Sequence, residues 1–374
     1  MMRMIVATSQ YAPEVGGVPR LLAYFTRHCP SSVNLHLLSV QQQPTAFYQT
    51  YDAAAPFPIE RIAPRRAGLT SLMFTRRLRQ LVQQTRPQAI LSGVAYPTAI
   101  LAHLADPARR IPIVVYAHSE DVTIQHPVKR QLLSWALKGA AAVITVSQFT
   151  AHELTRLGVP PERIHIIPPG IEVEPFTNAR PCPDWSDKWV ILTVARLIAR
   201  KGQDTVIRTL PQLIPLVPQV HYLIAGSGPD EPALRQLVNE LGVAEHVTFV
   251  GRVTDAELPA YYQSCQAFAM LTRPGKDEVE GFGISFLEAA AAAKPVVAGQ
   301  AGGSADALQP GVTGFLVDPH DVNAAAQALL TLAQDPPLCR QMGQAGQQWV
   351  QQHRTAEQFA AKVMGVVRGV MRDA

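Results

Sequence analysis

Three stretches of this sequence carry residue types suited to a phosphorylated, hydroxyl-rich ligand. The first is the pair Gly16 and Gly17, which follows the short apolar run Met4–Thr8 and precedes a predicted helix. Paired glycines let the backbone approach a diphosphate closely, and the start of the helix offers free N–H groups. The same pair can equally form an ordinary turn, because it lacks the full Gly-x-Gly-x-x-Gly pattern of a dinucleotide site.

The second stretch places two cations, Arg196 and Lys201, just after the apolar run Trp189–Val194. Arginine supplies a fork of hydrogen-bond donors and lysine a compact charge, so the two together can hold a leaving diphosphate. The alternative is a pair of solvated surface cations.

The third stretch runs from Glu280 to Glu288 and combines two carboxylates with a glycine-rich loop and the start of a helix. The amides of Gly281–Ser285 at the helix start suit a phosphate or a sugar hydroxyl. Glu288, about one turn into the helix, can accept both hydroxyls of a ribose, while Glu280 can face a transferred sugar. Loop glycines and two acids contribute nothing to a hydrophobic core, so we favour a binding site here.

These residues are embedded in an alternation of strand-like apolar runs and helical patterns. The runs are continuous rather than alternating, which indicates strands covered on both faces and hence parallel sheets. In the first half they are Met4–Thr8, Val33–Val40, Ala89–Ser92, Ile111–Ala117, Ala142–Val146 and Ile164–Ile167. In the second half they are Trp189–Val194, Val220–Ala225, Val247–Val250, Ala267–Leu271, Pro295–Ala298 and Phe315–Val317.

A proline-rich segment between the two halves predicts a domain boundary. Residues 168–183 contain five prolines, which favours a stiff, extended linker. We therefore expect an α/β protein of two Rossmann-like domains, residues 1–169 and 189–354, joined by a linker at 170–188. The final segment, residues 355–374, predicts a helix that returns to the first domain. Ligands of such sheets sit beyond the carboxyl ends of the strands, so the expected site is a cleft between the domains.

Composition narrows the class of protein further. The 374 residues are 47% apolar and 17% charged, as in soluble globular proteins, and no run approaches the roughly 20 apolar residues of a membrane span. The sequence opens on a strand-like run rather than an export signal, and its four cysteines form no Cys-x-x-Cys, so we expect a cytoplasmic protein with reduced thiols.

Charge is distributed unevenly along the chain. Residues 1–170 carry 17 basic and 8 acidic side chains, a net charge of +9, whereas the whole chain has only +4. Arginines cluster around the apolar run Leu69–Phe74, on a predicted helix that also carries Leu78 and Leu81. Such a helix can dock on an anionic membrane, although an ordinary amphipathic helix packed on the sheet has the same pattern. The arginines are Arg61, Arg65, Arg66, Arg76, Arg77 and Arg79.

Taken together, the motifs resemble those of glycosyltransferase family 4, the retaining enzymes of GT-B fold. The Glu280–Glu288 stretch is similar to the paired-glutamate motif of that family, and Arg196 with Lys201 is similar to its phosphate-binding pair. Asp277–Glu288 and Val296–Gly299 are similar to bacterial phosphatidylinositol mannoside mannosyltransferases. Further matches in family order are Gly16 and Gly17, His118, Val146 and Ser147, residues 168–172, 226–229, 250–253, Gly302 and Gly303, and 314–317.

The resemblance implies a role for each matching residue. Arg196 and Lys201 would neutralise the departing diphosphate in place of a metal ion, in agreement with the absence of Asp-x-Asp from the sequence. No metal site and no cofactor beyond the donor are expected. Glu288 would hold the ribose, and His118 would lie near the anomeric carbon. The remaining donor contacts would be the diphosphate at Gly16 and Gly17, the base at Arg252 and Val253, and the donor sugar at Glu280, Phe282, Gly283, Ile284 and Ser285.

The expected reaction is the transfer of a hexose, with retention, from a GDP- or UDP-linked donor to a lipid-linked or saccharide acceptor. The partners would be these two substrates and an anionic membrane surface, with no nucleic acid. A sugar-nucleotide epimerase of the same fold and a non-catalytic nucleotide- or glycan-binding module are the alternatives. A dinucleotide-dependent dehydrogenase fits least, because the glycine-rich turn is incomplete.

Overall fold

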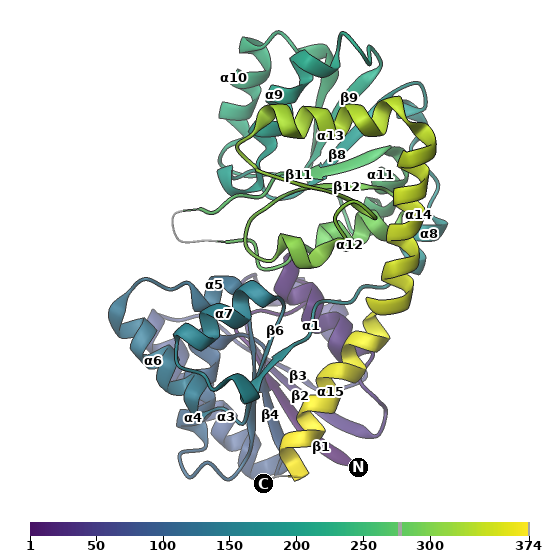
Figure 1. Ribbon diagram of the computed structural model, residues 1–374. Helices are drawn as coiled ribbons and strands as arrows, with labels where there is room; N and C mark the ends of the chain where they lie inside the picture. The colour runs from purple at the N-terminus through teal and green to yellow at the C-terminus, as the bar shows by residue number, and fades with distance from the viewer. Residues whose placement is uncertain (276–278, 373–374) are drawn as a thin grey trace. The chain divides into compact units, whose positions relative to one another are not determined.

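The computed structural model describes residues 1–275 and 279–372, which divide into two compact units. Unit 1 comprises Met1–Gly170 and the C-terminal segment from Ala356, and unit 2 comprises Ile171–Thr355. Each unit is built on one parallel sheet with helices on both faces (Figure 1). The predicted class, two parallel-sheet α/β domains, is confirmed.

Residues 1–170 form a seven-stranded sheet in the order β3-β2-β1-β4-β5-β6-β7. Every neighbouring pair is parallel, so all seven carboxyl ends lie along one edge. The strands are β1 Met2–Ala7, β2 Val33–Val40, β3 Ile59–Ile62, β4 Ala89–Ser92, β5 Ile113–Ala117, β6 Ala142–Thr145 and β7 Ile164–Ile166.

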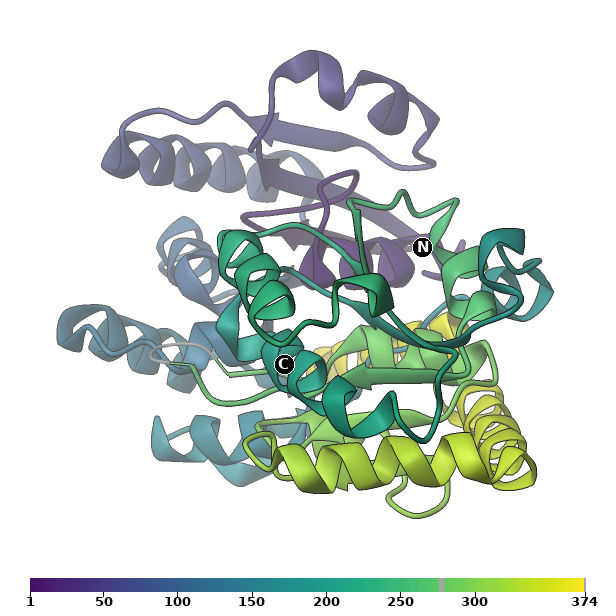
Figure 2. The same ribbon diagram turned by 90° about the horizontal axis from the view of Figure 1, so that it is seen from above.

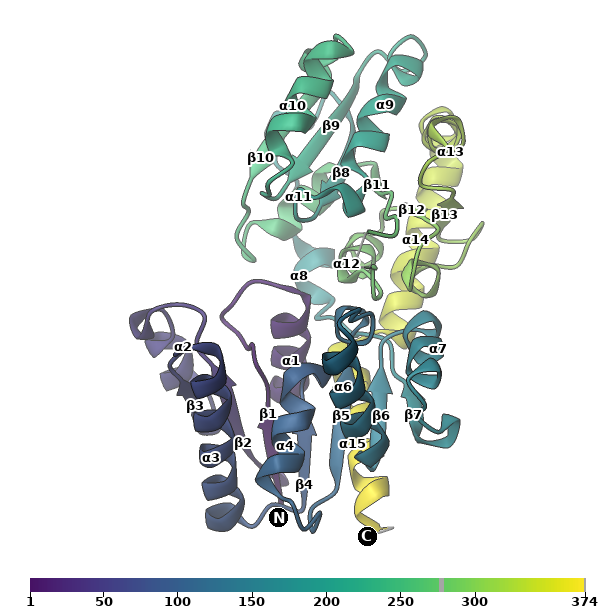
Figure 3. The same cartoon turned by 90° about the vertical axis from the view of Figure 1, so that its left-hand side faces the viewer.

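The sheet of unit 1 is covered by helices on both faces. The α-helices of residues 1–170 are α1 Gly17–Arg27, α2 Gln49–Ala54, α3 Ala67–Thr85, α4 Ile100–Ala105, α5 Ser119–Val122, α6 Pro127–Gly139 and α7 Gln148–Arg156. Helix α3 runs alongside the edge strand β3 (Figure 2), and α3, α4 and α6 lie next to one another on one face (Figure 3). Fully buried Ile5, Ile90 and Val115 form the centre of the core beneath them.

The C-terminal helix α15, Ala356–Arg372, packs within unit 1, as the sequence predicted. It lies against α1 (Figure 1). His28 Nδ1 is 3.2 Å from Glu357 Oε1, and the Cys29 thiol contacts the Met364 sulfur.

In the described part of unit 2, six parallel strands follow the order β10-β9-β8-β11-β12-β13. They are β8 Trp189–Val194, β9 Val220–Ala225, β10 Val247–Gly251, β11 Ala267–Met270, β12 Val296–Gly299 and β13 Gly314–Val317. The covering helices are α9 Gln203–Leu213, α10 Glu231–Glu240, α11 Leu258–Ser264, α12 Ile284–Ala291, α13 Val322–Gln334 and α14 Pro336–His353. Ile191, Ile207 and Leu329 are fully buried between the sheet and α9 and α13.

The expectation of an extended backbone in the proline-rich linker is wrong in one respect. The segment contains a short helix, α8, at Glu174–Asn178. Pro175 lies in the first turn of α8, where a missing N–H breaks no helical hydrogen bond, so this proline is compatible with a helix. Phe176 of α8 is buried against Tyr262 of unit 2, with ring centroids 5.5 Å apart, which gives the helix a tertiary contact.

Candidate functional site

The loop after β8 carries the cations that the sequence singled out. Arg196 is exposed two residues beyond the strand, and Lys201 ends a short 3-10 turn, Ala199–Lys201. Gly202 follows with φ 71°, and a Cβ there would lie 2.0 Å from the carbonyl oxygen of Leu271. Only glycine fits this position, so the turn that presents Lys201 at the start of α9 depends on it.

Two glycines in the loop after β9 restrict the backbone around Arg196. Gly226 and Gly228, after β9, pack so tightly on the backbone of residues 195–197 that a Cβ would lie 1.9 and 2.2 Å from carbonyl oxygens there. The N–H of Gly226 also donates to the carbonyl of Gly251 at 2.7 Å. The loop bearing Arg252 and Val253 therefore lies beside the loop bearing Arg196. Arg252 is exposed and Val253 half-buried.

Glu280 accepts hydrogen bonds from two cations at a single carboxylate oxygen. Arg200 Nη1 donates to Glu280 Oε2 at 3.0 Å, and Lys201 Nζ donates to the same oxygen. The side chain of Arg200 is 6% exposed, that of Lys201 13% and that of Glu280 11%, so the cluster is largely buried. The sequence singled out Lys201 and Glu280 as site residues but predicted neither their pairing nor the participation of Arg200, for which the adjacent Lys201 was the only sequence signal.

The cluster keeps Glu280 ionised. Burial alone would raise the pKa of this carboxyl, but attraction by Lys201, by Arg200 and then by Arg196 outweighs burial and lowers the pKa below its usual value. Glu280 is therefore a carboxylate, which can only accept hydrogen bonds, and a sugar hydroxyl is a matching donor.

The backbone of Glu280 is held by the glycine pair Gly302 and Gly303. The N–H of Gly303 donates to the Glu280 carbonyl at 2.9 Å, and Gly302 has φ 58° with room for no side chain. A Cβ at Gly302 would lie 2.3 Å from that same carbonyl oxygen. This pair thus positions Glu280, a function that the sequence pattern did not suggest. Asp277 and Glu278, part of the motif noted in the sequence, lie outside the described residues.

Helix α12 begins directly after the glycine-rich loop. Gly283 is its N-cap with φ 91°, and Ile284 and Ser285 open its first turn, whose N–H groups lack the i−4 carbonyl partners of the helix interior. Ser285 Oγ donates to the carbonyl of Val194 at 3.0 Å, which ties this turn to the end of β8. Phe282 is buried beside it. The predicted donor-sugar residues thus adjoin the strand that leads into Arg196.

Glu288 lies further along α12 and is 1% exposed. Its Oε2 accepts a hydrogen bond from the hydroxyl of Tyr262 at 2.7 Å. Tyr262 is fully buried and its ring lies 5.7 Å from that of Phe268, so the partner is firmly placed. Tyr262 is a second residue that sequence reasoning missed, since nothing in α11 distinguishes it from a core tyrosine.

Unit 1 presents its own predicted residues at the carboxyl ends of its strands. Gly16 and Gly17 begin α1 after β1 and are exposed, and His118 follows β5. The ring Nε2 of His118 lies 3.1 Å from the carbonyl of Gly93 and donates to it. Burial lowers the pKa of His118, only partly offset by nearby Asp121, so its ring is neutral near pH 7.

Asp121 connects the His118 loop to the loop after β4. Its carboxylate accepts hydrogen bonds from the backbone N–H of Ala95 at 2.8 Å and of His118 at 3.3 Å. Burial raises the pKa of Asp121, while His118 and these amides oppose the shift.

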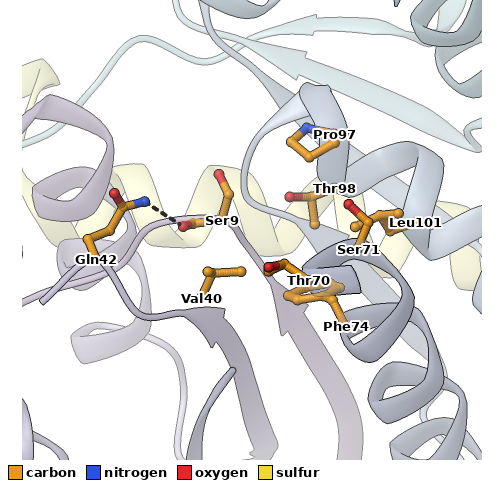
Figure 4. Close-up of a pocket in the computed structure, with 9 residues that line it drawn as sticks. All are labelled: Ser9, Val40, Gln42, Thr70, Ser71, Phe74, Pro97, Thr98 and Leu101. Carbon is orange, nitrogen blue, oxygen red and sulfur yellow. Dashed lines mark hydrogen bonds between the residues drawn. The ribbon is translucent and has the colours of Figure 1, made fainter. Parts of the chain in front are cut away.

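A cavity of about 280 Å³ opens at the same edge of the unit 1 sheet. Figure 4 shows side chains from the loops after β1, β2 and β4 and from the first turns of α3 surrounding it. Its lining combines apolar side chains with hydroxyls and one amide: Val40, Phe74, Pro97 and Leu101 with Ser9, Thr70, Ser71, Thr98 and Gln42. Gln42 Nε2 donates to the carbonyl of Ser9 at 3.3 Å. Such a mixed lining suits part of a ligand that has both hydroxyl and apolar groups.

Three of the six arginines around α3 are engaged in structural contacts. Arg61 forms a bidentate pair with Asp52, with its side chain only 3% exposed. Arg77 pairs with Glu60, and Arg79 Nη2 donates to the carbonyl of Leu104 at 2.7 Å. Of the apolar residues, Phe74, Leu78 and Leu81 are buried, whereas Leu69 and Leu72 are 49% and 64% exposed. No described helix is both long and apolar enough to cross a membrane.

The fold defines a class before any relative is considered: two parallel α/β units, one of which carries a cation–carboxylate cluster at its strand ends. Solved structures of that class match nearly the whole chain. Anabaena HepE in complex with UDP has a TM-score of 0.82 at 20% identity, covering 98% of this chain and 100% of that one. Sucrose-phosphate synthase from Thermosynechococcus elongatus has a TM-score of 0.82 at 21% identity, covering 100% of both. The predicted GT-B fold is confirmed.

Sequence relatives are more specific. Residues 15–175 match the model described as Glycosyltransferase Family 4, and residues 178–349 match Glycosyl transferases group 1. The GDP-mannose-dependent alpha-(1-6)-phosphatidylinositol monomannoside mannosyltransferase of Mycobacterium tuberculosis is 32% identical over 99% of each chain. The corresponding enzyme of Corynebacterium glutamicum, specific by name for the monoacylated acceptor, is 29% identical over 99% of each. This chain belongs to glycosyltransferase family 4, as its motifs predicted.

Proposed function

We propose that this protein transfers a mannosyl residue from GDP-mannose to the headgroup of a phosphatidylinositol-based glycolipid. GDP-mannose is favoured over a UDP-sugar because the relatives that depend on it by name are 32% and 29% identical over nearly their whole length. The HepE complex with UDP is only 20% identical and supports the fold alone.

The observation that carries the proposal is the cluster of Arg196, Arg200 and Lys201 around the ionised Glu280. A departing diphosphate gains negative charge as the glycosidic bond breaks, and fixed cations stabilise that charge in the transition state. The Lys201 ammonium has three donors, so it can keep its bond to Glu280 and still donate to a phosphate oxygen. Glu280, held additionally by Arg200, then accepts a hydrogen bond from a hydroxyl of the donor sugar.

The remaining predicted residues complete the donor site in this proposal. The N-terminal amides of α12 bind the sugar, Glu288 binds the ribose, and Arg252 and Val253 border the base. Gly16 and Gly17 approach the diphosphate, and His118 lies near the anomeric carbon. Transfer proceeds with retention and without a metal ion, because the cations supply the charge that a metal would otherwise supply. The cavity of unit 1 receives part of the acceptor.

A product assay tests the proposal against its rivals. Purified protein is incubated with GDP-mannose or UDP-glucose, with and without phosphatidylinositol monomannoside, and the products are identified by mass spectrometry and NMR. We expect a mannosylated lipid with an α linkage that forms only with GDP-mannose and acceptor. Isomerised donor without acceptor would indicate an epimerase, and donor binding without any product would indicate a binding module.

We also propose that the protein works at the surface of an anionic membrane, attached reversibly through unit 1. The excess of basic residues in this half and the lipid acceptor of the relatives support this.

A further inference from the structure

Helix α6 carries a row of exposed apolar side chains. Val128, Leu132 and Trp135 are 58%, 46% and 42% exposed. Their spacing of four and three residues places them on one side of the helix over a length of about 10 Å. The opposite side, with Leu133, Ala136 and Leu137, is fully buried in the core of unit 1. The core contacts of α6 therefore do not involve the exposed apolar row.

Helix α4 packs beside α6 (Figure 3). The ring of His103 on α4 lies 5.3 Å from that of Trp135. We call Val128, Leu132 and Trp135 the α6 face. Large apolar side chains that gather in this way mark an interaction surface, whereas single exposed ones do not.

The surroundings of the α6 face are cationic. Lys129 and Lys138 are exposed on α6, and the Arg109 guanidinium lies 5.9 Å from the centre of the Trp135 ring. No acidic residue occurs between positions 61 and 105 or between 122 and 152, the stretches that contain α3, α4 and α6. Three acidic residues lie between these stretches: Asp106 is buried and accepts a hydrogen bond from the N–H of Ile111, Asp121 accepts from the N–H of Ala95, and Glu120 is exposed on α5. The excess of positive charge around the α6 face favours a negatively charged partner.

This charge argues against a second copy of the chain as the occupant. A twofold contact would place the α6 face of one copy against the same face of another and oppose like charges. An anionic lipid surface fits better, because tryptophan prefers the membrane interface and lysines can extend their charges to lipid headgroups while their stems cover apolar groups.

We propose that the α6 face is the surface through which this protein docks on an anionic bilayer. On α3 the exposed large apolar residues are Leu69 and Leu72, whereas Phe74, Leu78 and Leu81 are at most 1% exposed, so α6 presents the longer apolar row and α3 is the alternative that the test must exclude. This inference rests on the proposed function, because a lipid acceptor is the reason for docking on a membrane. Docking itself can be measured without any transfer of sugar.

Trp135 provides a direct readout. Vesicles of phosphatidylcholine alone and of phosphatidylcholine with phosphatidylglycerol are added to the full-length protein, and tryptophan emission and co-sedimentation are followed. We expect binding and a blue shift with anionic vesicles only, both reversed by salt. The blue shift should be absent in Trp135→Phe, because Trp185, Trp189 and Trp349 lie on other elements.

Matched variants locate the surface. Leu132→Ser with Trp135→Ser should abolish sedimentation, whereas Leu216→Ser, at an equally exposed site in unit 2, should not change it. Lys129→Gln and Lys138→Gln should each weaken partitioning about fivefold, the effect of about 1 kcal/mol per charge. Thermal melts confirm that the variants are folded, and a GDP thermal shift that stays unchanged shows an intact donor site.

The proposal is wrong if wild type does not sediment with anionic vesicles, or if the α6 double variant sediments like wild type. It is also wrong if sedimentation is lost only in Leu72→Ser and Arg76→Glu, a result that would assign docking to α3. A dimer in solution that Leu132→Ser dissociates would instead make the α6 face a subunit interface. Failure of docking would leave the transferase assay unaffected, so the two proposals fail separately.

Discussion

Arg200 and Glu280, 80 positions apart in the chain, meet in a hydrogen bond of 3.0 Å on the oxygen that Lys201 also contacts. Arg200 is only 7% exposed, so its guanidinium is poorly placed to contact the substrate directly. Its contact fixes the orientation and ionisation of the carboxylate and leaves Lys201 able to serve the phosphate. We regard Arg200 as a positioning residue for Glu280.

Replacing Arg200 tests this role. In Arg200→Met the pKa of Glu280 rises towards its usual value, because one of the cations that lower it is gone. We expect kcat to fall roughly 10-fold and the acidic limb of the pH–activity profile to move to higher pH, since Glu280 acts as a carboxylate. Arg200→Lys should restore part of the lost kcat and move the acidic limb part of the way back to lower pH. Arg235→Met, which removes an exposed arginine paired with Glu231, is the control. An unchanged acidic limb in Arg200→Met would reduce Arg200 to a structural residue.

Lys201→Ala and Glu280→Ala should each reduce turnover by about 100-fold or more, the usual effect of removing one electrostatic partner of a transition state. Steady-state rates with GDP-mannose and acceptor, measured beside a GDP thermal shift, separate lost turnover from lost binding. Wild-type rates in either variant would remove that residue from the mechanism.

The burial of the cluster adds a stability effect that the sequence did not predict. The sequence predicts that both side chains line a cleft, where a polar side chain can be replaced without disturbing the core. In the structure Glu280→Gln leaves Arg200 and Lys201 largely buried without their carboxylate, a change that costs about 3 kcal/mol of unfolding free energy. Urea unfolding at neutral pH should show a loss of this order, against almost none for the exposed Glu240→Gln.

The loss of unfolding free energy in Glu280→Gln should become smaller as the pH is lowered. The pKa of Glu280 is lowered in the folded state, so its stabilisation is fully present above the unfolded-state pKa, about 4.3, and disappears as pH falls through the lower folded-state value. The difference in unfolding free energy between wild type and Glu280→Gln should therefore shrink below about pH 4. A difference that grew on acidification would contradict the ion-pair assignment.

Much of this architecture could be predicted because its signals are local. Continuous apolar runs identify every strand except β3, where Glu60 and Arg61 interrupt a four-residue edge strand that is only half-buried. The glycines that shape the candidate site were visible as motifs, although the close approach of Gly302 to Glu280 was not. Arg200 and Tyr262 escaped notice because their partners lie 80 and 26 positions away, and nothing local distinguishes a paired arginine or tyrosine from an ordinary one.

Transfer should survive chelation of metal ions. Arg196 and Lys201 supply positive charge in the loop after β8, and the sequence contains no Asp-x-Asp. Activity measured in EDTA should stay within about twofold of the untreated rate, and added magnesium or manganese should not raise it. Complete loss on chelation with recovery on addition of either ion would refute the metal-free mechanism.

The cavity of unit 1 can be tested by filling it. Ser71 lines the cavity from the second turn of α3, beside Thr98 and Leu101, so the ring of Ser71→Phe would occupy much of its roughly 280 Å³. If the cavity receives part of the acceptor, KM for phosphatidylinositol monomannoside should rise about 10-fold or more. KM for GDP-mannose and the GDP thermal shift should stay unchanged, because α3 carries none of the proposed donor residues. Gln83→Phe adds the same ring to an exposed position of the same helix and should leave both constants unaltered. A Ser71→Phe enzyme that is folded and has the wild-type KM for acceptor would show that the acceptor binds elsewhere.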